Sequence, residues 1–119
     1  EDQVKKTISE IYKSTGYAID THTAVAASVG KTYLEENKDE RKTVIASTAS
    51  PYKFARSVMT SIDEKYDTLE EFDLIAELEK ISCVKIPKAI EEIRDAKIVH
   101  TRECDADKME ETVKEILNV

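Results

Sequence analysis

The chain has 119 residues, with 18 Lys or Arg against 25 Asp or Glu, which gives a formal net charge of -7. Acidic and basic residues interleave, as in residues 35–42 and 105–115, so no clustered basic surface is expected for nucleic acid or anionic lipid. No apolar run approaches the roughly 20 residues of a membrane span, and two cysteines are too few for a disulfide framework, so we expect a reduced, cytoplasmic protein.

The first third of the chain predicts two helices. Apolar residues within 4–12 recur at i, i+4, i+7 and i+8, which is one face of a helix that ends near Gly16. Residues 17–20 are expected to be an extended connector. A second helix is predicted from about His22 to Glu35, with Asp20 or Thr21 as its N-cap. Its apolar side is mostly alanine, so we expect another element to pack close to its backbone.

The middle of the chain predicts a strand followed by a helix. After a charged turn at 38–42, Thr43–Ser47 is short, β-branched and apolar, which is typical of a buried parallel strand. Ser50 and Pro51 then provide a favoured N-cap and a favoured first helical residue. The helix that they begin carries apolar residues at i, i+4 and i+8 from Phe54.

The last part predicts three more helices and one strand. Residues 68–71 have the capping-box pattern and precede a helix with an apolar face over 74–81. Pro87 begins a short helix, Lys97–Thr101 is a candidate strand, and Asp105 or Asp107 begins the last helix. Two strands seldom form a sheet of their own. We therefore expect residues 1–119 to be one helix-rich α/β unit with few strands, which lends them to a sheet begun elsewhere.

The turn after the first predicted strand is the most informative candidate site. Ligands of open α/β sheets gather at the carboxyl ends of strands, and a helix N-terminus there offers unpaired N–H groups. The hydroxyls of Ser47, Thr48 and Ser50 lie at this turn, and Lys53 follows one turn later. This arrangement suits a phosphate or a polar ring nitrogen. The alternative is that the hydroxyls only cap the helix and end the strand.

A second candidate is His22, at the start of the alanine-rich helix, which could bind or orient a ligand. The alternative is an ordinary histidine in the first turn of a helix capped by Asp20. No metal site is expected, because His100 and Cys104 lack further ligands at a suitable spacing. The two glycines leave no glycine-rich phosphate loop.

Two segments in this order resemble the threonine synthases. Residues 16–26, Gly-Tyr-Ala-Ile-Asp-Thr-His-Thr-Ala-Val-Ala, resemble the family's glycine, hydrophobic stretch, acidic residue and Pro-His-Thr-Ala-Val. Residues 46–54, Ala-Ser-Thr-Ala-Ser-Pro-Tyr-Lys-Phe, resemble its Thr-Ala-His-Pro-Ala-Lys-Phe. The tail from Cys83 is also similar to the family's C-terminal end. Thr21 replaces the family's proline and Ser50 its histidine.

The resemblance implies the C-terminal fragment of a fold type II pyridoxal-phosphate enzyme, a lyase of threonine biosynthesis. The family converts O-phosphohomoserine and water to threonine and phosphate. Thr48 matches the hydroxyl that faces the cofactor's pyridine nitrogen, and the candidate substrate-binding residues are Lys53, His22 and Ser50. The lysine that forms the Schiff base is expected upstream, outside this chain.

Three further expectations follow. The fragment alone should be inactive and bind pyridoxal phosphate very weakly. Its partners should be the substrate in the parent enzyme, the rest of the parent chain, and a second copy through exposed apolar surface. The alternative functions are a non-enzymatic binding or regulatory module built on the same scaffold, and an unrelated small α/β enzyme that uses the hydroxyl cluster.

Overall fold

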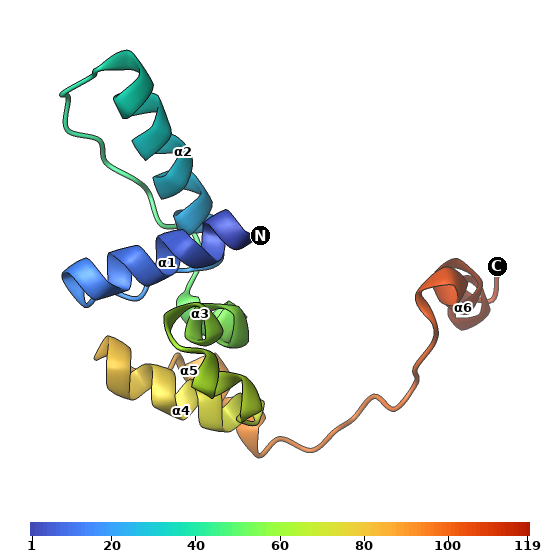
Figure 1. Ribbon diagram of the computed structural model, residues 1–119. Helices are drawn as coiled ribbons and strands as arrows, with labels where there is room; N and C mark the ends of the chain where they lie inside the picture. Colours follow the sequence, from blue (N-terminus) through green and yellow to red (C-terminus); the bar gives the residue numbers. More distant parts are fainter.

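The computed structural model describes residues 1–119 and is 66% helical, without a strand. The chain forms six α-helices, and a short 3-10 helix precedes α3, α4 and α6. Figure 1 shows how they are arranged. In chain order the elements are α1 (Asp2–Thr15), α2 (Thr21–Asn37), η1 (Pro51–Phe54), α3 (Ala55–Ile62), η2 (Glu64–Thr68), α4 (Glu71–Ser82), α5 (Lys88–Arg94), η3 (Ala106–Lys108) and α6 (Met109–Leu117).

The first two helices begin and end where the sequence predicts. Helix α1 ends at Gly16, whose φ of 72° is left-handed and whose N–H donates to the Tyr12 carbonyl. The connector 17–20 is extended, and Asp20 is the N-cap of α2. The close packing expected along the alanine face is found at Ala24, which is fully buried. It does not continue along the helix, because a side chain added at Gly30 would meet nothing within 4 Å.

Neither of the two predicted strands forms within this chain. Residues 43–48 and 96–105 are extended, but neither segment pairs with another. Val44 is 92% exposed and Ile98 77% exposed, so their apolar side chains lack the buried setting that the sequence predicts. A strand is held by hydrogen bonds to a neighbouring strand, and these two segments do not reach each other. The α/β class is therefore not observed, whereas the helix-rich character is confirmed.

Helices α1, α3 and α4 form the core together with the start of α2. Ile8, Val58, Met59, Leu74 and Leu78 are fully buried there. Ser50 is the N-cap of η1 and Pro51 its first residue, as predicted.

The capping box predicted at residues 68–71 does not form at the start of α4. The Thr68 hydroxyl instead donates to the Lys65 carbonyl at 3.3 Å inside η2, and α4 begins after Glu70 without a side-chain cap. The helix nevertheless turns the predicted apolar face toward the core.

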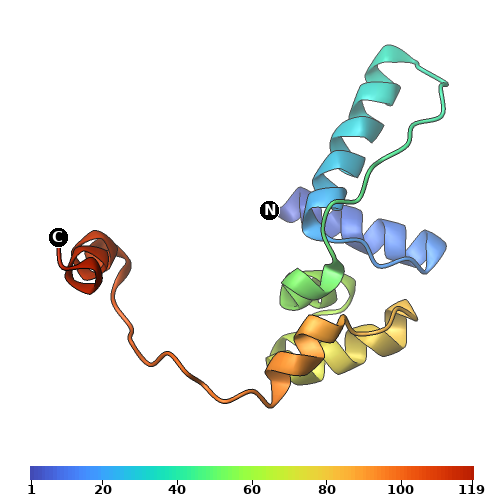
Figure 2. The same ribbon diagram turned by 180° about the vertical axis from the view of Figure 1, so that it is seen from behind.

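The C-terminal helix lies apart from this core. The extended stretch 96–105 carries α6 away from the other helices, as the two opposite views agree (Figures 1 and 2). The radius of gyration is 18.6 Å, compared with about 13.5 Å for a compact chain of this length. The apolar face predicted for α6 exists, but Met109, Val113 and Leu117 on it are 58%, 52% and 63% exposed.

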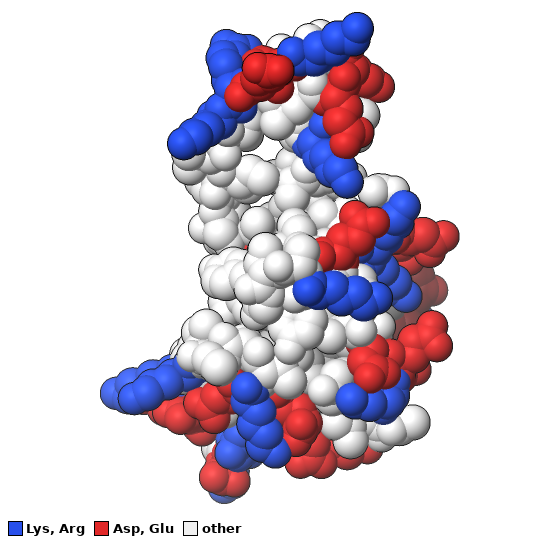
Figure 3. Space-filling view, turned by 60° about the vertical axis from the view of Figure 1, so that its left-hand side comes forward, with Lys and Arg blue, Asp and Glu red and all other residues white.

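Charges of both signs are distributed over the surface. On the face in Figure 3, Lys and Arg lie among Asp and Glu at the top, at the bottom and along the right side, and an uncharged area occupies the centre and left. No helix combines the length and the apolarity that a bilayer crossing requires.

Candidate functional site

A buried carboxylate joins the two segments that contain the candidate site residues. Asp20 is fully buried at the start of α2. Its Oδ1 accepts hydrogen bonds from the backbone N–H of His22 at 2.8 Å and of Thr23 at 3.2 Å. Its Oδ2 accepts from the Thr23 hydroxyl and, at 3.2 Å, from the hydroxyl of Ser47. The Thr23 and Ser47 hydroxyl oxygens are themselves 2.8 Å apart, so the turn at 46–51 is bound to α2.

These hydrogen bonds keep Asp20 ionised. Burial alone raises the pKa of the carboxyl, because it disfavours the charged form. The hydrogen bonds from the Thr23 side chain and backbone, the His22 backbone and Ser47 act in the opposite direction and outweigh burial. The net effect is a pKa below the usual value for aspartate. A stable negative charge therefore lies directly beneath the turn.

His22 and Lys53 meet at the ring of Phe54. The His22 and Phe54 ring centroids are 5.2 Å apart, with their planes inclined by 48°. The Lys53 ammonium lies 5.4 Å from the Phe54 centroid, within the range of a cation–π contact. His22 Nδ1 is also 3.4 Å from Asp20 Oδ1, while 60% of its side chain is exposed. Two of the predicted site residues are thus brought together, by an aromatic side chain that the sequence did not single out.

The three hydroxyls of the turn have different roles. Ser47 donates to Asp20, and Ser50 accepts from the N–H of Tyr52 at 3.3 Å as the cap of η1. Thr48 is exposed between them and has no hydrogen-bond partner within the chain. The capping alternative is therefore correct for Ser50, whereas the Thr48 hydroxyl caps nothing.

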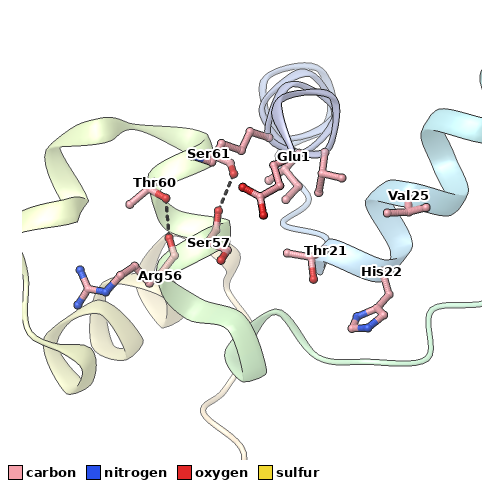
Figure 4. Close-up of a pocket in the computed structure, with 11 residues that line it drawn as sticks. Glu1, Thr21, His22, Val25, Arg56, Ser57, Thr60 and Ser61 are labelled. Atoms are coloured by element: carbon pink, nitrogen blue, oxygen red, sulfur yellow. Dashed lines mark hydrogen bonds between the residues drawn. The ribbon is translucent and has the colours of Figure 1, made fainter. Parts of the chain in front are cut away.

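The hollow beside this region includes only one of the candidates. A space of about 510 Å³ lies between α1, α2 and α3, and His22 is part of its lining, as are Thr21 and Thr60. Figure 4 shows the His22 ring at its edge, while the Arg56 guanidinium points away from it. Thr48, Ser50 and Lys53 do not line this hollow. They lie on the open surface around the turn instead.

The tertiary contacts of two side chains near the site could not be predicted from the sequence. Tyr52 is 3% exposed and its hydroxyl donates to the Val84 carbonyl, which fixes η1 against the end of α4. Arg56 donates to the carbonyls of Asp67 at 2.8 Å and Leu69 at 2.7 Å and so holds that loop against α3. Both contacts join residues that are distant in sequence, and no local pattern encodes such a pairing.

No group of three or more potential metal ligands comes together in the chain. Cys83 and Cys104 are free and exposed. The turn and its neighbours present hydroxyl groups at Thr48 and Ser50, the Lys53 ammonium and the His22 imidazole.

Comparison with known proteins gives a consistent result. Residues 23–100 match the family described as "Threonine synthase, C-terminal". A threonine synthase of Schizosaccharomyces pombe is 40% identical over 67 residues, which are 56% of this chain and 13% of that relative. The chain thus corresponds to a small part of the length of the relative that it matches.

Proposed function

The chain belongs to the threonine synthase C-terminal family, and on this basis we propose that it is the C-terminal part of an enzyme that converts O-phosphohomoserine and water to threonine and phosphate. The observation that carries the proposal is the contact between Asp20 and Ser47. It joins the two segments, 16–26 and 46–54, that resemble the family's motifs. The contact supports the proposal that these segments are parts of one site rather than two independent similarities.

The residues of the turn fit one end of pyridoxal phosphate. The family's cofactor presents a ring nitrogen, and a hydroxyl can hydrogen-bond it without holding it protonated. Thr48 provides such a hydroxyl, exposed and without a partner in the chain. The two glycines cannot build a phosphate cradle, so the cofactor's phosphate would be held by residues outside this chain. When bound, the cofactor supplies an electron sink for negative charge that develops on the substrate.

The other candidates would act on the substrate. Lys53 and His22 place an ammonium and an imidazole on one aromatic ring, close to the turn. Both groups suit the phosphate of O-phosphohomoserine, because that phosphate is an anion with several acceptor oxygens. Ser50 accepts one hydrogen bond but keeps its own proton free to donate. We assign these three residues to substrate binding and Thr48 to cofactor binding.

This assignment extends to the setting of the protein. The lysine that anchors the cofactor covalently is expected in the part of the enzyme that precedes these residues, so the 119-residue chain alone should release no phosphate. The exposed apolar face of α6 and the unpaired segment 43–48 are expected to pack against that preceding part, or in its absence against a second copy. We further expect the enzyme to be cytoplasmic.

The experiment is phosphate release from O-phosphohomoserine by the complete polypeptide that carries these residues. Thr48→Ala should weaken pyridoxal phosphate binding about tenfold, the equivalent of about 1.4 kcal/mol for one hydrogen bond. Thr48→Ser should retain most of the affinity because it keeps the hydroxyl. Thr32→Ala is the matched control, since that exposed hydroxyl bonds only the Ser28 carbonyl within α2.

Two results would contradict the proposal. If Thr48→Ala binds the cofactor as tightly as the unaltered polypeptide, Thr48 does not contact the ring. If the polypeptide binds the cofactor but releases no phosphate, the non-enzymatic module is the better description, and Ser50 in place of the family's histidine becomes the first position to restore.

A further inference from the structure

We propose that Asp20 is a positioning residue, whose buried carboxylate acts through Ser47 to fix the turn that carries Thr48. The residue touches neither cofactor nor substrate. It determines where the Thr48 hydroxyl is presented, and thereby how tightly the cofactor ring is held. This inference rests on the proposed function, because it takes Thr48 as the cofactor contact.

The two oxygens of Asp20 have separate tasks. Oδ1 accepts hydrogen bonds from the N–H groups of His22 and Thr23, as the side chain of a helix N-cap normally does. Oδ2 takes no part in the cap and receives the hydroxyls of Thr23 and Ser47. A cap alone does not require the second oxygen to be buried, and a buried carboxylate is costly unless all its acceptor positions are used. The long-range contact through Oδ2 is thus a second role, distinct from the cap.

The segment that contains Thr48 has few other attachments. Residues 42–49 make no backbone hydrogen bond to another element, and Val44 is 92% exposed. The only side-chain hydrogen bonds that join residues 43–48 to another element are those of Ser47 with Asp20 and Thr23. Ser47 immediately precedes Thr48, so the residue that is hydrogen-bonded to Asp20 is the direct neighbour of the residue with the unbonded hydroxyl. Without this anchor, the hydrogen bonds that remain between the turn and its neighbours would be those of Ser50 with η1.

The geometry also couples the two halves of the site. Asp20 lies two residues before His22, and its Oδ1 is 3.4 Å from the imidazole Nδ1. The same side chain therefore contacts the His22 segment through one oxygen and the Thr48 segment through the other. A displacement of Asp20 would change the separation between the proposed substrate contact and the proposed cofactor contact.

The test uses Ser47→Ala, which removes the anchor and leaves both the cap and the core intact. Ser47→Thr restores a hydroxyl in an extended segment that tolerates β-branched residues. Ser14→Ala is the control, because the Ser14 hydroxyl is exposed and bonds only carbonyls of its own helix. Two readouts are needed: backbone amide order parameters of residues 47–49 in the 119-residue chain, and the pyridoxal phosphate dissociation constant of the complete polypeptide.

We expect Ser47→Ala to lower the order parameters of residues 47–49 from near 0.8 to below about 0.6. It should raise the cofactor dissociation constant about tenfold, whereas Ser47→Thr and the Ser14→Ala control should leave both quantities near their original values. If Ser47 had only a structural role, Ser47→Ala would lower the melting temperature without lowering the order parameters of residues 47–49. Ser47→Thr would then not restore the cofactor affinity.

The outcomes separate this inference from the proposed function. Unchanged order parameters in Ser47→Ala would overturn the positioning role, whatever the enzyme does. A looser turn with unchanged cofactor affinity would overturn the link between Asp20 and the cofactor. If the unaltered polypeptide binds no pyridoxal phosphate, both the proposed function and the positioning role toward that cofactor are wrong. The order parameters of Ser47→Ala would still show whether Asp20 and Ser47 fix the turn.

Discussion

The separation between the core and α6 is tested by making the same substitution in both places. Leu78 is fully buried in α4, and Leu117 is 63% exposed in α6. Leu→Ala removes the same side-chain atoms at both positions and changes helix propensity little, because Leu and Ala are both good helix formers. Any difference between the two variants in the free energy of unfolding therefore reports the packing that each leucine has lost.

Leu78→Ala should cost about 3 kcal/mol, because a fully buried leucine loses its transfer free energy and leaves a cavity. Leu117→Ala should stay within about 0.5 kcal/mol of the unaltered chain. In urea, with a slope of about 1.5 kcal/mol/M, the midpoint should fall by about 2 M for Leu78→Ala. The assay is urea unfolding followed by far-UV circular dichroism. A loss of more than about 1.5 kcal/mol for Leu117→Ala would refute the reasoning, because it would mean that α6 packs on the core.

Three further predictions follow from the contacts described above. The pKa of Asp20 is depressed, so its contribution to stability is present above the unfolded pKa of about 3.9 and is lost as the pH falls through the folded value. Asp20→Asn should therefore flatten the decline of the urea midpoint below about pH 4, and parallel declines would contradict this. Burial, together with Glu79, raises the pKa of Tyr52, so the absorbance titration near 295 nm should lose its latest component in Tyr52→Phe; a titration in which the latest component persists would exclude Tyr52 as its source. Limited trypsin digestion should cut first at Lys97 or Arg102 in the exposed stretch 96–105, and early cleavage within α1 or α4 would be inconsistent with the packing.

The helices were predictable because their signals are local. Apolar periodicity and end residues such as Gly16 and Asp20 act within a few positions of each other, and the structure confirms the helices that they predict. The strands at 43–47 and 97–101 were not. Their β-branched, apolar composition encodes an extended backbone, which is observed, but pairing depends on a neighbouring strand that these residues do not supply.

The sequence predicted a set of candidate site residues but not their arrangement in space. The sequence indicated His22, Thr48, Ser50 and Lys53 without distinguishing a cap from a ligand contact. That distinction depends on which hydroxyl already has a partner, and Ser47 finds its partner 27 residues away, in Asp20. Two residues 27 positions apart share no helical or strand periodicity that could predict their contact. They meet only because the folded chain brings the turn at 46–51 against the start of α2.

The amino-acid sequence by itself determined the helical segments, the interleaving of acidic and basic residues and the family resemblance, because each depends on residue types at short, fixed spacings. Tertiary structure decided that Asp20 is buried beneath the turn, that Phe54 brings His22 and Lys53 together, and that Thr48 keeps a free hydroxyl. It also decided that α6 stays apart from the core. These outcomes depend on which surfaces meet in space. Hydrogen bonds and apolar contacts between residues distant in sequence form only when the chain folds. Helix signals, by contrast, depend on neighbouring residues and can be read from the sequence directly.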